Sequence, residues 1–477
     1  MPLKAVDENV IIGVADALRE ADGNPSAKYK PANFPAAVRR VSELGGFHDI
    51  TFRNAVGNIP RRTFVSEIRN FALGDEYEES NSKNPKRENI QAGHVLAAKL
   101  TNTKFIMVYK QQAEIRAVIG TINENVIQYE VPHVIQRIGS DGAPQDYFAK
   151  VSSMNMAALS PTRVVISFCS TATGSGYTRG QLKTFMALNI NGNVIQEETG
   201  LVSIHEYGNH TSLLPVAEDT FLVITYDSTH GTLFMLKVAG SNISYDKNRV
   251  DLGGGADWYN NYSMTLLSDS TVAIAVAGGN QVVIHPYVIN EEGIVKKTNS
   301  VTFDLAGAAV VITALIDENK FLLCAGAQGK IYGRTVTVAQ NITLGKMDSN
   351  LTTGIWWQFS LVRINPYSFV LGMFADVTQN IGNATATVGL EIHEDNIELT
   401  LEQAHDGTCF GALEHISGNK VLMCYNIIDN GAVAGTILDA KSGVTIANGS
   451  QPIFGLTTKA ANDGEWATIA VPREAAH

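Results

Sequence analysis

The chain has 477 residues, of which 17% are charged and 45% hydrophobic, and its formal net charge is −11. This acidic balance, without a long basic run, argues against nucleic-acid binding. No apolar stretch approaches the roughly 20 residues that a membrane-spanning helix needs, so we expect no membrane insertion. The length allows two or three average domains or one large closed β fold, and the 42 glycines favour a fold with many tight turns.

Residues 1–46 predict a small helical module. Apolar residues recur at helical spacing in DENVIIGVADALREADG, where Asp7 is the candidate N-cap and Gly23 the stop signal. PAAVRRVSEL predicts a second short amphipathic helix. Two such helices bury too little surface to fold robustly alone, so we expect them to dock on a partner or on copies of the chain. The expected attachment residues are Val10, Ile11, Val14, Leu18, Phe34, Val38 and Val41.

Residues 47–90 predict a connecting segment. HDITF and RTFVSEI have the composition of strands, and GDEYEESNSKNPKRENIQ is polar and charged enough to form an exposed linker. The N-terminus, MPLKAVDENV, lacks the charged start and apolar core of a secretory signal. We therefore expect assembly in a reducing cytosol, with no disulfide among Cys169, Cys324, Cys409 and Cys424.

From residue 91 onward one phrase occurs seven times. An apolar residue leads into polar turn residues, then Lys, Arg, Thr or Ser, and then an apolar run, as in LTNTKFIMVY and IDENKFLLCA. Separations of about 50 residues are typical of repeats in which one supersecondary unit follows another. The residues that open the seven apolar runs are Phe105, Val164, Phe221, Val272, Phe321, Phe369 and Val421.

A second phrase follows each first one and predicts a second hairpin. Alternating apolar residues reach a polar turn and resume, as in ALNINGNVIQEE and TILDAKSGVTI. Asn and Gly tolerate the positive φ of tight hairpin turns. Two hairpins in each of seven units predict an all-β fold, a seven-bladed β-propeller of four-stranded blades over residues 91–477. The segment EWATIAV could return to close the ring, but the role of residues 457–477 stays open.

Aromatic and polar residues gather just before each predicted innermost strand, where they would line one mouth of the ring. Trp and Tyr beside Asp, Asn and His suit a glycan, because flat apolar faces stack on sugar rings and polar groups bind the hydroxyls. The alternative is that these aromatic residues fill the gaps between blades, as large side chains in propellers usually do. The candidate ligand-binding residues are Tyr147, His205, Tyr207, Asp257, Trp258, Tyr259, Trp356, Trp357, Asp406 and Phe410, and Tyr262, Phe359 and His210 lie in the same segments.

The sequence does not predict an enzyme. His205 and His210 are five residues apart, whereas the zincin spacing is four, so no metal site is indicated. Asp257 and Asp406 could pair as acid and base for glycoside hydrolysis, but an Asp in such segments is usually a turn residue. GSGYTRG lacks the Lys-Ser/Thr and helix of a phosphate-binding loop. No cofactor is indicated.

The N-terminal segment resembles a short module of bacteriophage minor structural and tail-fibre-like proteins. The family pattern, an acidic start, an "IA-A-IR-K-G" helix and a "kytp-eMp-aI--I" segment, is met here by two groups of residues. These are Asp7, Ile11, Ile12, Val14, Ala15, Ala17, Leu18, Arg19 and Gly23, and then Lys28, Tyr29, Lys30, Pro31, Phe34, Pro35, Ala37 and Val38. The family's Lys-Thr-Gly is Ala21-Asp22-Gly23 here, and its Met is Phe34.

The resemblance covers about a tenth of the chain and implies a virion protein assembled in the host cytoplasm. It implies a tail or baseplate location, contacts with other virion structural proteins, and a homo-oligomer, often a trimer in phage fibres. The propeller would then bind a host-surface glycan or protein through many weak contacts. Two alternatives stay open, a capsid decoration or head-fibre protein and a propeller glycan hydrolase or lyase.

Overall fold

The computed structural model describes strands and turns between residues 47 and 472. The described ranges are 47–54, 64–73, 77–78, 95–111, 114–123, 126–135, 151–170, 182–197, 202–205, 210–226, 231–239, 242–246, 248–253, 261–268, 270–290, 293–353, 356–375, 384–393, 395–406, 408–427, 433–446, 455–457 and 466–472. Every described element is a β-strand. The predicted N-terminal helices and their attachment residues, Val10 to Val41, lie outside these ranges and stay predictions.

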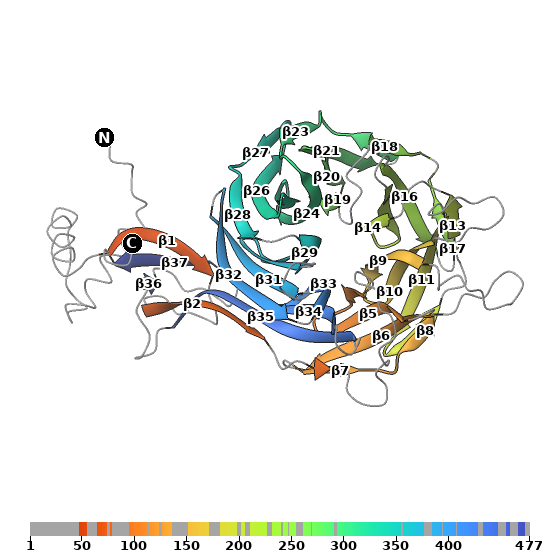
Figure 1. Cartoon of the computed structure of the whole chain (residues 1–477), viewed down its shortest axis with the longest axis horizontal. Coiled ribbons are helices and arrows are strands. Elements are labelled where there is room, and N and C mark those ends of the chain that lie inside the picture. Colours follow the sequence, from red (N-terminus) through yellow and green to blue (C-terminus); the bar gives the residue numbers. More distant parts are fainter. Residues whose placement is uncertain are drawn as a thin grey trace, which may run out of the picture. The chain divides into compact units, whose positions relative to one another are not determined.

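The chain divides into two compact units, residues 1–71 with 441–477, and residues 72–440. The larger unit is a seven-bladed β-propeller, whose blades follow one another around the ring in Figure 1. The innermost strand of each blade packs on the innermost strands of its two neighbours, and the last packs on the first. These strands are β4 (Val95–Lys99), β9 (Val151–Ser160), β14 (His210–Ala217), β19 (Tyr262–Leu266), β24 (Ala308–Asp317), β29 (Trp356–Asn365) and β33 (Thr408–Ser417).

The apolar runs of the seven-fold phrase form the second strand of every blade. The opening residue of each run, from Phe105 to Val421, is at most 1% exposed, because both faces of these strands are covered by neighbouring blades. The prediction of repeated blades is therefore confirmed. The second strands are β5 (Lys104–Gln111), β10 (Arg163–Ser170), β15 (Thr220–Tyr226), β20 (Thr271–Gly278), β25 (Lys320–Ala327), β30 (Ser368–Ala375) and β34 (Lys420–Ile427).

The third strands carry the second hairpin of each blade. Gly192, in the predicted Asn-Gly turn, has a φ of 64°, which is the conformation that this turn requires. The third strands are β6 (Glu114–Asn123), β11 (Leu182–Asn191), β16 (Gly231–Ala239), β21 (Gln281–Asn290), β26 (Lys330–Val338), β31 (Ala384–His393) and β35 (Val433–Ile446).

The outer edge of the blades departs from the simple four-strand prediction. In five blades two short strands share the third strand's outer edge, whereas in the sixth blade β32 (Asn396–Asp406) runs unbroken along β31. The paired outer strands are β7 (Val126–Tyr129) and β8 (His133–Ile135), β12 (Val194–Glu197) and β13 (Val202–His205), β17 (Asn242–Tyr245) and β18 (Val250–Gly253), β22 (Gly293–Lys296) and β23 (Val301–Asp304), and β27 (Ile342–Leu344) and β28 (Asp348–Thr353).

The seventh blade corrects the prediction for TILDAKSGVTI. No turn interrupts this segment, since β35 is one strand from Val433 to Ile446. The outer partner of β35 within the propeller is instead β3 (Tyr77–Glu78), in which Tyr77 pairs with Gly435 and Glu78 with Ala434. A strand from before the first blade thus completes the last one. The blade count could be predicted from local patterns, but this closing pair joins residues more than 350 positions apart.

The smaller unit contains antiparallel strands from both ends of the chain. Its strand β1 (Phe47–Asn54) pairs with β37 (Trp466–Pro472), as in the register of Ile50 with Ala470. The strand β36 (Gly455–Thr457) pairs with β37 and with the start of β2 (Phe64–Leu73). The predicted strands in residues 47–73 are therefore confirmed. EWATIAV, whose role the sequence left open, belongs to this sheet.

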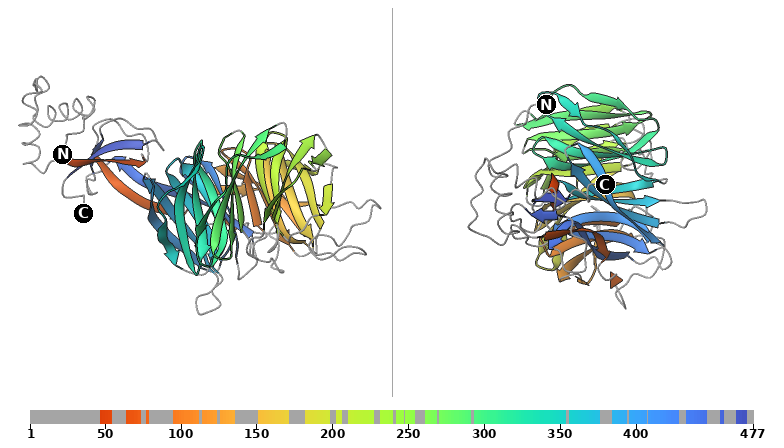
Figure 2. Two further views of the ribbon diagram at one scale, coloured as in Figure 1. Left: turned by 90° about the horizontal axis from the view of Figure 1, so that it is seen from above. Right: turned by 90° about the vertical axis from the view of Figure 1, so that its left-hand side faces the viewer.

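Blade-to-blade packing forms the core of the propeller. Leu100, Val108 and Ile119 of the first blade pack with Val164 and Leu188 of the second, and similar clusters join the later neighbours. Figure 2 shows the blades from the side, stacked with their sheets face to face. The side chains of Cys169, Cys324 and Cys424 are buried in second strands. The side chain of Cys409 is not among those that the structure describes.

Candidate binding face of the propeller

The propeller has two faces that differ in their connections. Because strands alternate in direction within a blade, the turns after the first and third strands meet on one face, which we call the turn face. The connections after the second strand and after the outer edge meet on the other, which we call the loop face. Turn-face connections are short, for example residues 161–162, 192–193, 318–319 and 418–419. Loop-face connections vary, from residues 279–280 to residues 136–150, 171–181 and 376–383.

Five of the ten candidate ligand-binding residues lie in described strands, at or near the strand ends that belong to the loop face. Tyr147, Tyr207 and Asp257 to Tyr259 fall in connections that lead to β9, β14 and β19, and they lie outside the described residues. His205 ends β13, Trp356 and Trp357 begin β29, Asp406 ends β32, and Phe410 follows the start of β33. The backbone of these five is described and their side chains are not. Their convergence on one ligand stays a prediction.

Three aromatic side chains of the same segments are described. Tyr262 is 3% exposed and Phe359 is 4% exposed, so both fill gaps between blades. A Cβ added at Gly326 of the fifth blade would lie 2.9 Å from the Phe359 ring. For Tyr262 and Phe359 the packing alternative therefore holds. His210 is only partly buried at the start of β14.

His210 and Tyr262 are part of an aromatic floor, which we define as His210, Tyr226 and Tyr262. The ring centroids of His210 and Tyr226 are 5.4 Å apart, and those of Tyr226 and Tyr262 are 4.8 Å apart. The Tyr262 hydroxyl donates a 2.6 Å hydrogen bond to the Gly253 carbonyl oxygen. Gly231 makes room for this ring, since a Cβ there would lie 2.6 Å from it.

The electrostatics of the floor keep its histidine neutral. Burial, and then the charge of Lys183, lower the pKa of His210 to about 4. Lys183 is fully buried in β11, at a position where the first, fourth and fifth blades have Ile115, Val282 and Ile331. A neutral imidazole tilted against the Tyr226 ring behaves as an apolar ring with a polar edge, which suits packing and ligand contact better than charge pairing.

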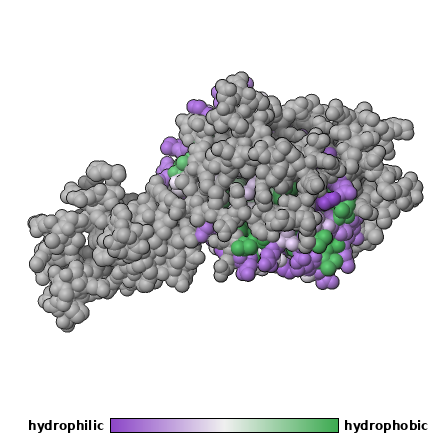
Figure 3. All heavy atoms as spheres, turned by 60° about the horizontal axis from the view of Figure 1, so that its bottom comes forward, coloured by the Kyte–Doolittle hydropathy of each residue, from purple (hydrophilic) through white to green (hydrophobic). Residues whose placement is uncertain are grey.

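The described residues show no sign of metal or membrane chemistry. Among them no group of three or more His, Cys, Asp or Glu side chains could hold a metal ion. Within the same ranges there is no helix long and apolar enough to cross a membrane. On the face drawn in Figure 3 the coloured residues are mostly hydrophilic, with small separate hydrophobic spots, so this part of the surface shows no broad apolar patch.

The turn face contains a polar contact between blades that the sequence did not predict. The Lys104 ammonium, at the start of β5, donates to the Asn193 side-chain oxygen in the second blade's outer turn at 2.7 Å. The Lys320 ammonium, at the start of β25, bonds Asp395 in the sixth blade's outer turn at 2.9 Å. In both contacts the Lys precedes the apolar run of its blade, and its partner lies at the same position of the outer turn in the next blade. The repeated Lys of the seven-fold phrase was the available signal, but its partner lies in the next blade.

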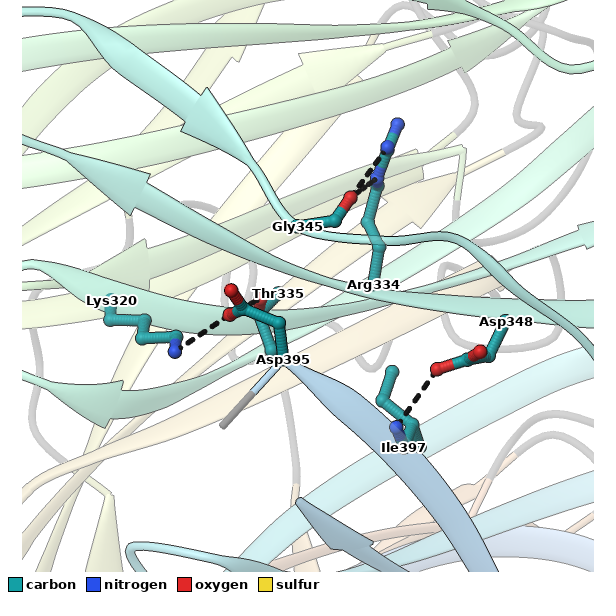
Figure 4. A network of polar contacts seen from close by, with 7 residues as sticks. All are labelled: Lys320, Arg334, Thr335, Gly345, Asp348, Asp395 and Ile397. Atoms are coloured by element: carbon teal, nitrogen blue, oxygen red, sulfur yellow. Dashed lines mark hydrogen bonds and ion pairs between the residues drawn. The ribbon is translucent and has the colours of Figure 1, made fainter. Parts of the chain in front are cut away.

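The contact between the fifth and sixth blades is reinforced by further hydrogen bonds. Figure 4 shows Thr335 and Lys320 both directed at Asp395, and the Thr335 hydroxyl donates at 2.6 Å. These two bonds, Thr335 first, lower the pKa of the Asp395 carboxyl. Asp348 of β28 accepts a 2.8 Å bond from the Ile397 backbone N–H of the neighbouring blade. Several hydrogen bonds therefore join the outer edges of the fifth and sixth blades.

Comparisons with known proteins give fold neighbours and no family. No protein-family model matches the sequence, and no curated protein is significantly similar to it. Among solved structures, the WD40 domain of Toxoplasma gondii coronin is 8% identical with a TM-score of 0.49, over 86% of this chain and 100% of that one.

Two further neighbours are more distant. The K499G mutant of NanB sialidase from Streptococcus pneumoniae is 9% identical with a TM-score of 0.39, over 78% of this chain and 70% of that one. The β-propeller domain of the Trilobed protease from Pyrococcus furiosus is 9% identical with a TM-score of 0.38, over 77% and 99%. None of the three bears on the function of this chain, whose fold is established by its own strand pairing.

Proposed function

We propose that this chain is a bacteriophage virion protein, associated with a tail fibre or baseplate, whose propeller binds a host-surface glycan or protein through its loop face. The observation that carries the binding role is the difference between the two faces. Recognition residues concentrate on variable connections held by a rigid scaffold, and between the strands that the structure describes the loop-face connections vary more in length than the turn-face ones. In this proposal all ten candidate ligand-binding residues belong to the loop face, as their place in the chain predicts.

The virion location rests on the resemblance of residues 7–38 to the phage module. In this proposal that module attaches the chain to other virion proteins, and several copies, three in the expected arrangement, hold their propellers at high local concentration. Weak individual contacts then sum to firm attachment. The proposal assigns no catalytic residue.

A comparison within the sixth blade tests the binding role. Trp356 and Trp357 begin β29 at the loop face, whereas Tyr367 lies in the turn after the same strand and is 38% exposed at the turn face. We expect Trp356→Ala with Trp357→Ala to reduce binding of the full-length protein to host cells at least tenfold. Tyr367→Ala is the matched control and is expected to bind as the unmodified chain does. Equal loss in both variants, or in neither, contradicts a loop-face site.

Electron cryo-microscopy of the intact particle tests the location. Residues 1–46 packed into a tail or baseplate component, with the propeller projecting, support the proposal. Residues 1–46 seated on capsid subunits indicate a decoration or head-fibre protein instead. Release of oligosaccharides from host polysaccharide by the purified protein overturns the non-catalytic role and favours a hydrolase or lyase.

A further inference from the structure

The propeller ring closes between its seventh and first blades, where β3 of the seventh blade precedes β4 of the first along the chain. We define the closing seam as the contact between β33 and β4 with the core beneath it. Val95 and Ala97 of β4 are buried there with Leu422, Cys424 and Ile437 of the seventh blade. Gly411 allows close approach, because a Cβ at this position would lie 2.7 Å from the Val95 Cβ.

One acidic residue interrupts this seam. Along β33, Ala412 and Ile416 pack into the seam core, and Glu414 lies between them in the alternating pattern of the strand, so it faces the first blade. Counting back from the turn that ends each innermost strand, six blades have an apolar residue or Thr at this position. These residues are Ala98, Ala157, Leu214, Thr265, Ala314 and Val362. Only the closing blade has a carboxyl group there.

The surroundings of Glu414 favour its uncharged form. Burial raises the pKa of this carboxyl to about 7, although the Lys99 backbone N–H bonds it and the Lys99 charge opposes the shift. The other described titratable groups near it are His415 on the same strand, Arg363 on β29 and Cys424 on β34. Charges of Lys99 and Arg363 act on His415, and Glu414 raises the pKa of the Cys424 thiol. Glu414 keeps some exposed surface, so water reaches it when the seam loosens.

We propose that Glu414 makes closure of the propeller ring sensitive to pH: the seam is held most tightly when this carboxyl is protonated, and it opens more readily once the carboxyl is ionised. The sign follows from linkage. The folded pKa lies above the ordinary value of 4.5, so the folded seam binds the proton more tightly than the open seam. Stability is therefore greatest below about pH 4.5 and falls as pH rises toward 7. This inference is independent of the proposed function.

Hydrogen exchange measured by mass spectrometry on the full-length protein tests whether the closing seam responds to pH. Labelling times are adjusted at pH 5, 6, 7 and 8 so that intrinsic exchange is equal, and the peptides compared contain β4 and β33. We expect the protection of these peptides in the unmodified chain to fall by tenfold to about a hundredfold between pH 5 and pH 8. A loss of about a hundredfold approaches the limit that the pKa shift sets. In Glu414→Gln the same peptides are expected to show no pH dependence.

Two controls make the result decisive. Peptides from β14 and β19, where Leu214 and Thr265 take the equivalent position, are expected to be independent of pH in both proteins. Glu414→Leu, which copies the residue of the third blade, serves if the Gln variant does not fold. A seam whose protection does not change with pH, or one that keeps its pH response in either variant, overturns the proposal.

Discussion

The turn face and the loop face of the propeller are made from the same strands, yet they follow different rules. On the turn face, residues at equivalent positions of the repeat make equivalent contacts: Lys104 and Lys320 each bind the outer turn of the next blade. On the loop face the connections share neither length nor composition, and the described part includes the aromatic floor, where the rings of His210, Tyr226 and Tyr262 are tilted against one another. Repetition maintains the scaffold, and departures from repetition are where a specific site can arise.

The largest expected effect concerns the repeated core, which both faces need. Phe105→Ala removes a fully buried ring that packs edge-on against Tyr129 with centroids 6.0 Å apart. We expect a loss of about 3–5 kcal/mol in the free energy of unfolding, measured by chemical denaturation. Val126→Ala, on the same blade but 44% exposed, is expected to cost less than about 0.5 kcal/mol. Similar losses in the two variants would show that the repeat does not define the core.

The next effect separates the faces. Gly231→Ala places a Cβ against the Tyr262 ring, so the aromatic floor must shift at a cost of about 1–3 kcal/mol. We expect reduced binding to host cells along with the lower melting temperature. Gly192→Ala, at a turn-face glycine with φ of 64° and open space around it, is the control. It is expected to lower stability through backbone strain while binding is unchanged. Unchanged binding in Gly231→Ala would separate the floor from the ligand site.

A third effect depends on pH. The pKa of His210 falls from 6.5 to about 4 on folding, so the unfolded chain takes up the proton first as pH drops. The contribution of a neutral His210 is therefore fully present above about pH 6.5 and is lost as pH falls toward 4. Because the ring is partly exposed, we expect a loss on the order of 1–2 kcal/mol over this range. His210→Phe should show a smaller drop in melting temperature between pH 7.5 and 4.5. An equal drop in both proteins would contradict this account.

The smallest effect belongs to the turn-face contacts. Lys320 and Asp395 have side chains 25% and 56% exposed, so their attraction is weakened by water and salt. A double-mutant cycle with Lys320→Met and Asp395→Asn should give a coupling of about 0.2–1 kcal/mol, decreasing in high salt. Lys346 and Asp348, 3.1 Å apart within one blade, provide a comparison pair. A coupling above 2 kcal/mol would mean that the contact is far less solvated than its exposure indicates.

Much of the fold follows from local sequence, but the candidate site does so only in part. The phrase IDENKFLLCA, whose apolar run begins at Phe321, predicted a turn and a strand, because turn residues and apolar runs act over a few positions. For Tyr262 and Phe359 the sequence left a ligand-facing role and a packing role open, and the structure buries both side chains between blades. An aromatic residue before a strand has the same local pattern in either role. Only the neighbouring blade decides between them.

The sequence by itself determined the seven-fold repeat and the order of the first three strands in each blade, since these depend on turn residues and apolar runs a few positions apart. Tertiary structure decided what depends on distant partners. Residues 77–78 complete the last blade, β37 pairs with β1, and Glu414 meets Lys99 where the ring closes. The physical reason is that a β-sheet edge accepts any strand of suitable register, and the chain's path in space, not its local pattern, brings that strand within hydrogen-bonding distance.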